Sequence, residues 1–170
     1  AIYEQSHPDI AKIEQVIGQA YVKNKADEQA LIHFQNAVDL RLTYDKPKLY
    51  RTYYQMANLY LNRNEYVLAA KYFPLNIDQR PDTSGRSHYS LALAKSELQE
   101  LEIAMEELEI ALAVYRQDSI DYIEEIANCY NLKGTIRDDQ KEYQSALAAY
   151  QQVVDICLAI EDADFTTLLF

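Results

Sequence analysis

The chain repeats one spacing of small residues four times, and this repetition constrains its fold more than any other feature. In each copy a glycine or alanine is followed 12 positions later by an alanine. The four pairs are Gly18 and Ala30, Ala57 and Ala69, Ala92 and Ala104, and Gly134 and Ala146. The spacing between copies varies, as expected where packing fixes a helix pair and loops absorb changes in length. The sequence therefore predicts four helix hairpins.

The second copy, residues 50–81, shows why such hairpins need neighbours. Met56 and Ala57 begin an apolar pattern at helical spacing, and Ala69 and Phe73 resume it after a short polar turn. Alanine is small where two helices touch, and aromatic rings fill the space beside it. A hairpin of this kind cannot bury its own apolar face, so we expect that face to pack on the next copy.

Large residues accompany the small ones at fixed positions. Four positions after each alanine stand Phe34, Phe73, Leu108 and Tyr150. Three positions after the first small residue stand Tyr21 and Tyr60, whereas Lys95 and Arg137 occupy this place in the other copies. This pattern resembles the tetratricopeptide repeat over nearly the whole chain, although the family's usual tryptophan is absent. The resemblance implies an all-α fold, a right-handed α-solenoid of about four helix hairpins.

The same pattern predicts where the helices begin and end. We expect helices at 8–24, 27–43, 47–62, 65–78, 86–98, 100–116, 120–137 and 140–161. They form repeats at 8–43, 47–78, 86–116 and 120–161 of a single domain over residues 1–170. Residues 162–170 are expected to start a further helix or a capping helix, and the chain to be a fragment of a longer protein. The longer repeat spacing also resembles that of bacterial peptide-sensing regulators of the Rap and PlcR type.

Composition and the scatter of reactive residues exclude several classes of function. With 16 basic and 27 acidic residues the net charge is −11, which disfavours nucleic acid and anionic membranes as partners. No run approaches the roughly 18 apolar residues that a membrane span needs. The three histidines are far apart in the sequence, and no glycine-rich phosphate loop or serine nucleophile motif is present. We therefore expect no catalytic residue, metal or cofactor, and no enzymatic activity.

The two cysteines, Cys129 and Cys157, both fall on apolar helical faces. Buried free thiols in a reducing compartment are one interpretation, and a disulfide or redox pair is the other. The first interpretation places the protein in the cytoplasm.

The family resemblance implies a concave groove lined by the first helix of each hairpin. Carried over by position, the groove residues are Lys12, Gln15 and Gln19, then Arg51, Tyr54 and Asn58, then Arg86, Tyr89 and Leu93, and finally Asn128, Asn131 and Thr135. Amides can satisfy the backbone of an extended peptide, and cations can bind a carboxylate. The alternative is that these are ordinary surface residues, with Tyr54 and Tyr89 serving in packing between helices.

These observations lead to two functional hypotheses. The first is a non-catalytic scaffold that binds a protein or peptide segment, acidic or C-terminal, in its groove; the sensory part of a larger bacterial regulator is one form of it. The second is a self-association or intramolecular assembly module without a peptide ligand, in which exposed repeat edges stack on another copy as a homo-oligomer.

Overall fold

The computed structural model describes residues 8–44, 48–79, 84–118 and 121–167, and this part of the chain is helical with no strand. The helices are α1 (Pro8–Lys23), α2 (Asp27–Tyr44), α3 (Leu49–Asn62), α4 (Tyr66–Ile77), α5 (Gly85–Glu97), α6 (Leu101–Tyr115), α7 (Ile123–Asp139) and α8 (Tyr143–Thr167), with a 3₁₀ turn η3 (Arg116–Asp118) after α6. Each α-helix begins within three residues of its expected start, the largest differences being 123 against 120 and 143 against 140. None of the described helices combines the length and the apolar character that crossing a membrane requires.

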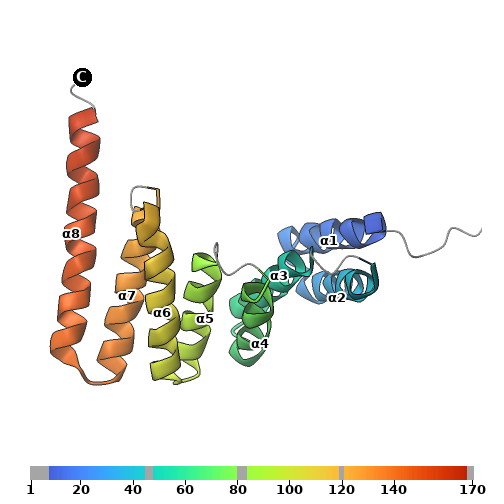
Figure 1. The fold of residues 1–170 in the computed structure, drawn as a ribbon, viewed down its shortest axis with the longest axis horizontal. Helices are drawn as coiled ribbons and strands as arrows, with labels where there is room; N and C mark the ends of the chain where they lie inside the picture. The colour runs from blue at the N-terminus through green and yellow to red at the C-terminus, as the bar shows by residue number, and fades with distance from the viewer. Residues whose placement is uncertain (1–7, 45–47, 80–83, 119–120, 168–170) are drawn as a thin grey trace, which may run out of the picture. The chain divides into compact units, whose positions relative to one another are not determined.

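The chain divides into two compact units. The N-terminal unit, Ala1–Pro81, holds the hairpins α1–α2 and α3–α4, and the C-terminal unit, Asp82–Phe170, holds α5–α6 and α7–α8 (Figure 1). In the C-terminal unit, α7 packs against both α6 and α8, so consecutive hairpins share a core there. A single repeat domain over residues 1–170 stays a prediction.

The repeated small residues form the contact between the two helices of each hairpin. Ala30, Ala69 and Ala104 are fully buried, and Ala146 is 3% exposed. A Cβ atom on Gly18 would lie 2.5 Å from Cε1 of Phe34, and one on Gly134 would overlap the ring of Tyr150. The paired helices approach so closely here that these positions have no room for a side chain larger than that of glycine or alanine. The spacing of 12 residues therefore determines which residues of the two helices of a hairpin lie opposite each other.

Each hairpin turns through one residue in the left-handed backbone region. These residues are Lys25, Asn64, Gln99 and Lys141, with φ of 57°, 60°, 60° and 63°. Each lies seven positions after the first small residue of its copy. The next backbone N–H then donates to a carbonyl five residues earlier, for example Glu142 to Arg137 at 2.8 Å. This is the Schellman pattern that ends many helices, although a glycine usually stands at its left-handed position.

The structure also explains why two copies lack the aromatic residue in the first helix. Tyr60 stacks on Tyr72 of the paired helix, with ring centroids 5.5 Å apart. Lys95 instead binds Glu100 at 2.6 Å, and Arg137 of the fourth copy binds a glutamate of its own turn in the same way. In the third and fourth copies, an ion pair across the turn thus takes the place of the two stacked aromatic rings.

Two expectations were wrong. Residues 162–167 do not start a new helix, because α8 runs without a break to Thr167 and no glycine or proline interrupts it; residues 168–170 lie outside the described part. The two cysteines are both free, but only Cys129 is buried, whereas Cys157 is exposed on α8.

Candidate functional site

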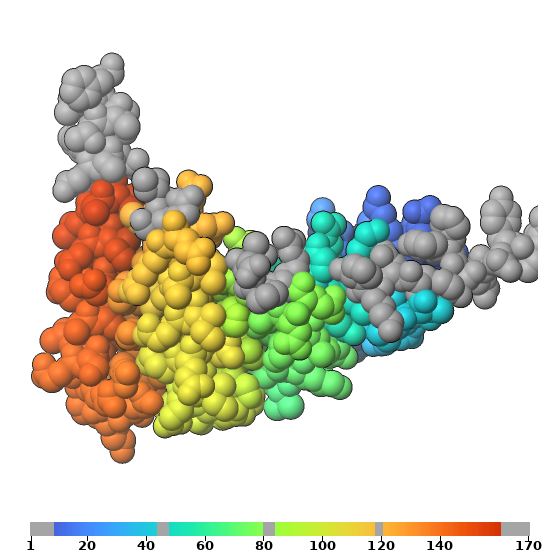
Figure 2. All heavy atoms as spheres, viewed as in Figure 1, coloured from blue at the N-terminus to red at the C-terminus, as the bar shows by residue number. Residues whose placement is uncertain are grey.

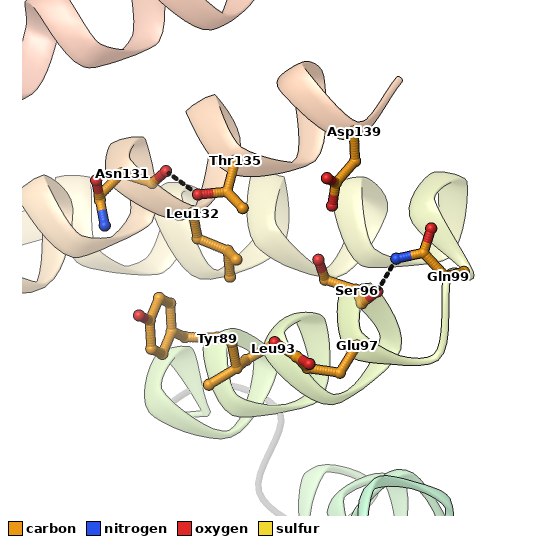
Figure 3. Close-up of a pocket in the computed structure, with 9 residues that line it drawn as sticks. All are labelled: Tyr89, Leu93, Ser96, Glu97, Gln99, Asn131, Leu132, Thr135 and Asp139. Carbon is orange, nitrogen blue, oxygen red and sulfur yellow. Dashed lines mark hydrogen bonds between the residues drawn. The ribbon is translucent and has the colours of Figure 1, made fainter. Parts of the chain in front are cut away.

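The C-terminal unit contains a pocket between α5 and α7 (Figure 3). Its volume is about 270 Å³, slightly below the range of roughly 300–1,000 Å³ in which small-molecule sites fall, so it suits a side chain or a short segment. The lining residues are Tyr89, Leu93, Ser96, Glu97, Gln99, Asn131, Leu132, Thr135 and Asp139.

Two rows of side chains form the opposite walls. Tyr89, Leu93 and Glu97 follow one another at four-residue spacing along α5. On α7 the facing row is Asn131, Thr135 and Asp139, at the same spacing (Figure 3). Residues four apart lie on one face of a helix, which is why each row points into a common space. Each member of the second row lies 42 positions after its counterpart, as Gly134 does after Ala92, so the walls are equivalent faces of successive repeats.

The middle of the pocket is apolar. Leu93 is half-buried, and Leu132 is 6% exposed and belongs to the core of the unit. The Tyr89 ring packs against the same core, and burial, followed by the nearby Cys129 thiol, raises the pKa of its phenol. A tyrosine is neutral near pH 7 even without this shift, so Tyr89 presents a ring and a hydroxyl rather than a charge.

The far end of the pocket is acidic. Glu97 and Asp139 are exposed, and neither carboxylate has a hydrogen-bond or ion-pair partner in the part of the chain that the structure describes. Nearby hydrogen bonds involve other groups: the Thr135 hydroxyl donates to the Asn131 carbonyl at 3.2 Å, and the Gln99 amide donates to the Ser96 carbonyl at 3.4 Å. Two carboxylates at one end of a partly apolar pocket favour a cationic group.

The structure brings some of the predicted groove residues together. Tyr89 and Leu93 of the third repeat and Asn131 and Thr135 of the fourth all line the pocket. The groove positions predicted from the family resemblance did not include Glu97 and Asp139, which stand one turn further along the same rows. Continuing the four-residue spacing beyond Leu93 and Thr135 would have found both.

Other predicted residues of the C-terminal unit lie outside the pocket. Arg86 is exposed, and its Nη2 lies 3.4 Å from Oε1 of Glu125 on α7. Asn128 is exposed and does not line the pocket. The pocket therefore begins one turn after the position predicted for the cation.

In the N-terminal unit, the structure corrects the role of Gln15. Its side chain is 9% exposed, and its Oε1 accepts a hydrogen bond of 2.6 Å from Nη2 of Arg41 on α2. Nη1 of the same guanidinium donates to the Thr52 hydroxyl and to the Lys48 carbonyl. Gln15 thus joins a buried polar network that links α1, α2 and α3, and it does not face an open groove.

The remaining predicted residues of this unit vary in exposure. Lys12 and Gln19 are exposed, as is Arg51, whose Nε donates to the Tyr50 hydroxyl at 2.9 Å. Tyr54 packs edge-on against Phe73, with ring centroids 6.4 Å apart. Asn58 is half-buried, and its amide donates to the Tyr54 carbonyl at 2.8 Å. This hydrogen bond within α3 satisfies one donor of the Asn58 amide.

Comparisons with known proteins agree with this architecture. Residues 127–159 match the family model of the tetratricopeptide repeat, which confirms the resemblance in the fourth copy. The sequence matches none of the curated proteins.

Solved structures share the fold over most of the chain. MamA 41-end from Desulfovibrio magneticus RS-1 is 17% identical, with a TM-score of 0.76 over 92% of this chain and 79% of that one. BtubC (BKLC) from P. vanneervenii is 13% identical, with a TM-score of 0.83 over 94% of this chain and 68% of that one. These similarities confirm the predicted fold class, an all-α solenoid of helix hairpins.

Proposed function

We propose that this chain, which is built of tetratricopeptide-type repeats, is a non-catalytic protein-interaction scaffold. In the C-terminal unit, it binds an extended segment of a partner protein along α5 and α7, the first helices of the two hairpins there. In the C-terminal unit, the pocket between α5 and α7 receives a lysine or arginine side chain of that segment.

One observation carries this proposal. Positions that the family resemblance assigns to a groove, Tyr89 and Asn131 among them, line one pocket together with two unpaired carboxylates. Surface helices carry amides and acids everywhere, but two equivalent rows that face each other across a hollow favour binding over chance exposure.

The chemistry of the walls matches a long cationic side chain. Its aliphatic stem would lie on Leu93, Leu132 and the Tyr89 ring, and its charged end would reach Glu97 and Asp139. Charge-assisted hydrogen bonds of this kind are roughly twice as strong as neutral ones. The Asn131 side chain could hold the peptide backbone, since an amide both donates and accepts.

The charge of the whole chain acts in the same direction. A net charge of −11 raises the rate at which a basic segment approaches, more strongly at low salt. The acidic or C-terminal partner expected from sequence has no cation in the pocket to bind. That partner stays a prediction for Lys12 and Arg51 of the N-terminal unit, as does membership of a bacterial regulator.

Panning a random library of short displayed peptides against the chain tests this proposal. Glu97→Gln combined with Asp139→Asn provides the counter-selection, and the expected result is enrichment of sequences with lysine or arginine at one position. For an enriched peptide, we expect the double variant to bind about tenfold more weakly, which corresponds to a loss of roughly 1.4 kcal/mol of binding free energy.

The matched control is Glu102→Gln combined with Glu106→Gln, which changes the net charge equally at exposed positions of α6 that do not line the pocket. We expect this control to bind as the parent does. Enrichment without any charge preference, or equal weakening by both double variants, would contradict the proposal.

A further inference from the structure

Helix α8 is apolar on two sides, and the described residues of the C-terminal unit cover one of them. Ala146 and Ala149 are buried on the side that packs against α7. The other side is open, and its exposed fractions are 62% for Tyr143, 62% for Leu147, 50% for Val154 and 55% for Leu158. We call these four residues the outer face of α8. They are 4, 7 and 4 positions apart, which is the spacing of one or two helical turns, so they form one stripe along the helix. Atoms of α8 lie at the surface of the C-terminal unit (Figure 2).

Charge is also scarce over residues 143–160 of α8, which contain one charged side chain, Asp155; the other three acidic residues of this helix follow at 161–164. By contrast, α6 carries four glutamates in 15 residues. A helix face in contact with water normally carries charges, and a contiguous apolar stripe without them marks an interaction surface.

The repeat register shows what kind of element this outer face would bind. Ala146 of α8 follows Ala104 of α6 by 42 positions, so Tyr143, Leu147 and Val154 correspond to Leu101, Met105 and Leu112. Leu112 belongs to a core cluster with Ile126, Cys129 and Leu132 of α7, and Leu101 and Met105 pack against that cluster. The outer face of α8 is therefore the face with which α6 receives the first helix of the following hairpin.

The chain also exposes the complementary face, on α1. Gly18 precedes Gly134 by 116 positions, so Ile13 and Val16 of α1 correspond to Cys129 and Leu132 of α7. On α7 these residues are 0% and 6% exposed, because they lie in the core shared with α6. On α1 the equivalent residues are 55% and 54% exposed. The α6 face and the α7 face that form the contact between these helices thus have equivalents on α8 and α1, and both equivalents are exposed.

We propose that α8 of one copy packs against α1 of a second copy, in the manner in which α6 packs against α7. The occupant of the outer face is a second copy because the same chain carries the matching helix face. The two surfaces differ, so the contact is heterologous: each copy that joins still offers one free face of each kind.

Sedimentation over a range of concentrations tests this contact. We expect the average mass of the parent chain to rise with concentration. Two double variants should stay monomeric: Leu147→Glu with Val154→Glu on α8, and Ile13→Glu with Val16→Glu on α1. All four residues are exposed, so helicity by circular dichroism should be unchanged. If a double variant loses helicity, the single variants Leu147→Glu and Ile13→Glu replace it.

A matched control and a mixing experiment complete the test. Val67→Glu, at a position on α4 that is 68% exposed, should associate as the parent does. An equal mixture of the two monomeric double variants should form a dimer and nothing larger, because each supplies the face that the other has lost. A parent chain that stays monomeric, an α1 variant that still associates, or a mixture that stays monomeric would overturn the proposal.

Discussion

At the scale of single residues, the left-handed turn positions show how a repeated fold tolerates local strain. Lys25, Gln99 and Lys141 adopt positive φ although their side chains disfavour it, and only Asn64 is of a type that enters this region readily. The turn is retained because the backbone bond after it, such as Glu142 to Arg137, closes the hairpin.

We expect Lys141→Gly to raise the free energy of unfolding by about 1 kcal/mol, since glycine adopts positive φ without the steric cost that lysine bears. Urea denaturation measures the change. Lys71→Gly is the control, because Lys71 is an exposed residue inside α4 and glycine there should lower stability by about 1 kcal/mol. Equal destabilisation by both changes would show that the turn is not strained.

At the same scale, the errors of sequence reasoning have identifiable causes. Gln15 was placed in a groove by position alone, but its partner Arg41 lies 26 residues away, and no local pattern reveals such a pairing. Glu97 and Asp139 were not assigned to the groove because the positions supplied by the family resemblance end at Leu93 and Thr135, one turn before them. Tyr89 and Asn131 were included because the family resemblance carries equivalent positions over to each copy.

At the scale of the element, α7 occupies the centre of the C-terminal unit and carries its most perturbed titratable group. Burial, and then the carboxylates of Glu109 and Glu125, raise the pKa of Cys129 from 9.0 to about 12. The neutral thiol is therefore favoured in the folded state. Between about pH 9 and pH 12 the unfolded chain loses this proton while the folded chain keeps it.

The contribution of Cys129 to stability should thus be complete below pH 9 and should be lost as the pH rises toward 12. The loss is at most about 1.4 kcal/mol per pH unit for one proton. Thermal unfolding at several pH values measures it, and Cys129→Ala should show a flatter decline than the parent above pH 9. Half-buried tyrosines such as Tyr53, whose pKa is raised first by burial and then by Tyr72 and Asp39, add a decline common to both proteins above pH 10.

Cys157→Ala is the control for this experiment, because Cys157 is exposed and its replacement leaves Cys129 in place. The control should decline with pH as the parent does. If Cys129→Ala declines as steeply as the parent, the thiol is not buried in the folded protein and the packing of α7 is different from that described.

The elements themselves were predictable to a large extent. The spacing of the small residues predicted the eight α-helices of the described residues, because the contact between paired helices admits only glycine or alanine. The end of α8 was not predictable in this way, since Asp162 gave a plausible helix start and nothing in the spacing opposes a continuous helix. The exposed side of α8 was missed for a related reason: sequence shows that a face is apolar, but not whether a neighbour covers it.

At the scale of the whole molecule, the two proposals assign different surfaces to different partners. The pocket between α5 and α7 is polar at one end and acidic, whereas the outer face of α8 is apolar and nearly uncharged. The two surfaces share no residue, so peptide binding and association between copies can be abolished separately. A chain with this arrangement can bind a basic segment at several positions of an assembly at once, which raises its effective affinity.

The most direct test of the central claim is a titration followed by NMR, with an enriched lysine- or arginine-containing peptide added to the Leu147→Glu, Val154→Glu variant. We predict that backbone amide signals of residues 89–99 and 131–139 shift, and that Glu97→Gln with Asp139→Asn removes these shifts. Shifts confined to the N-terminal unit, or shifts that persist without the two carboxylates, would contradict the assignment of the pocket as a site for a basic side chain.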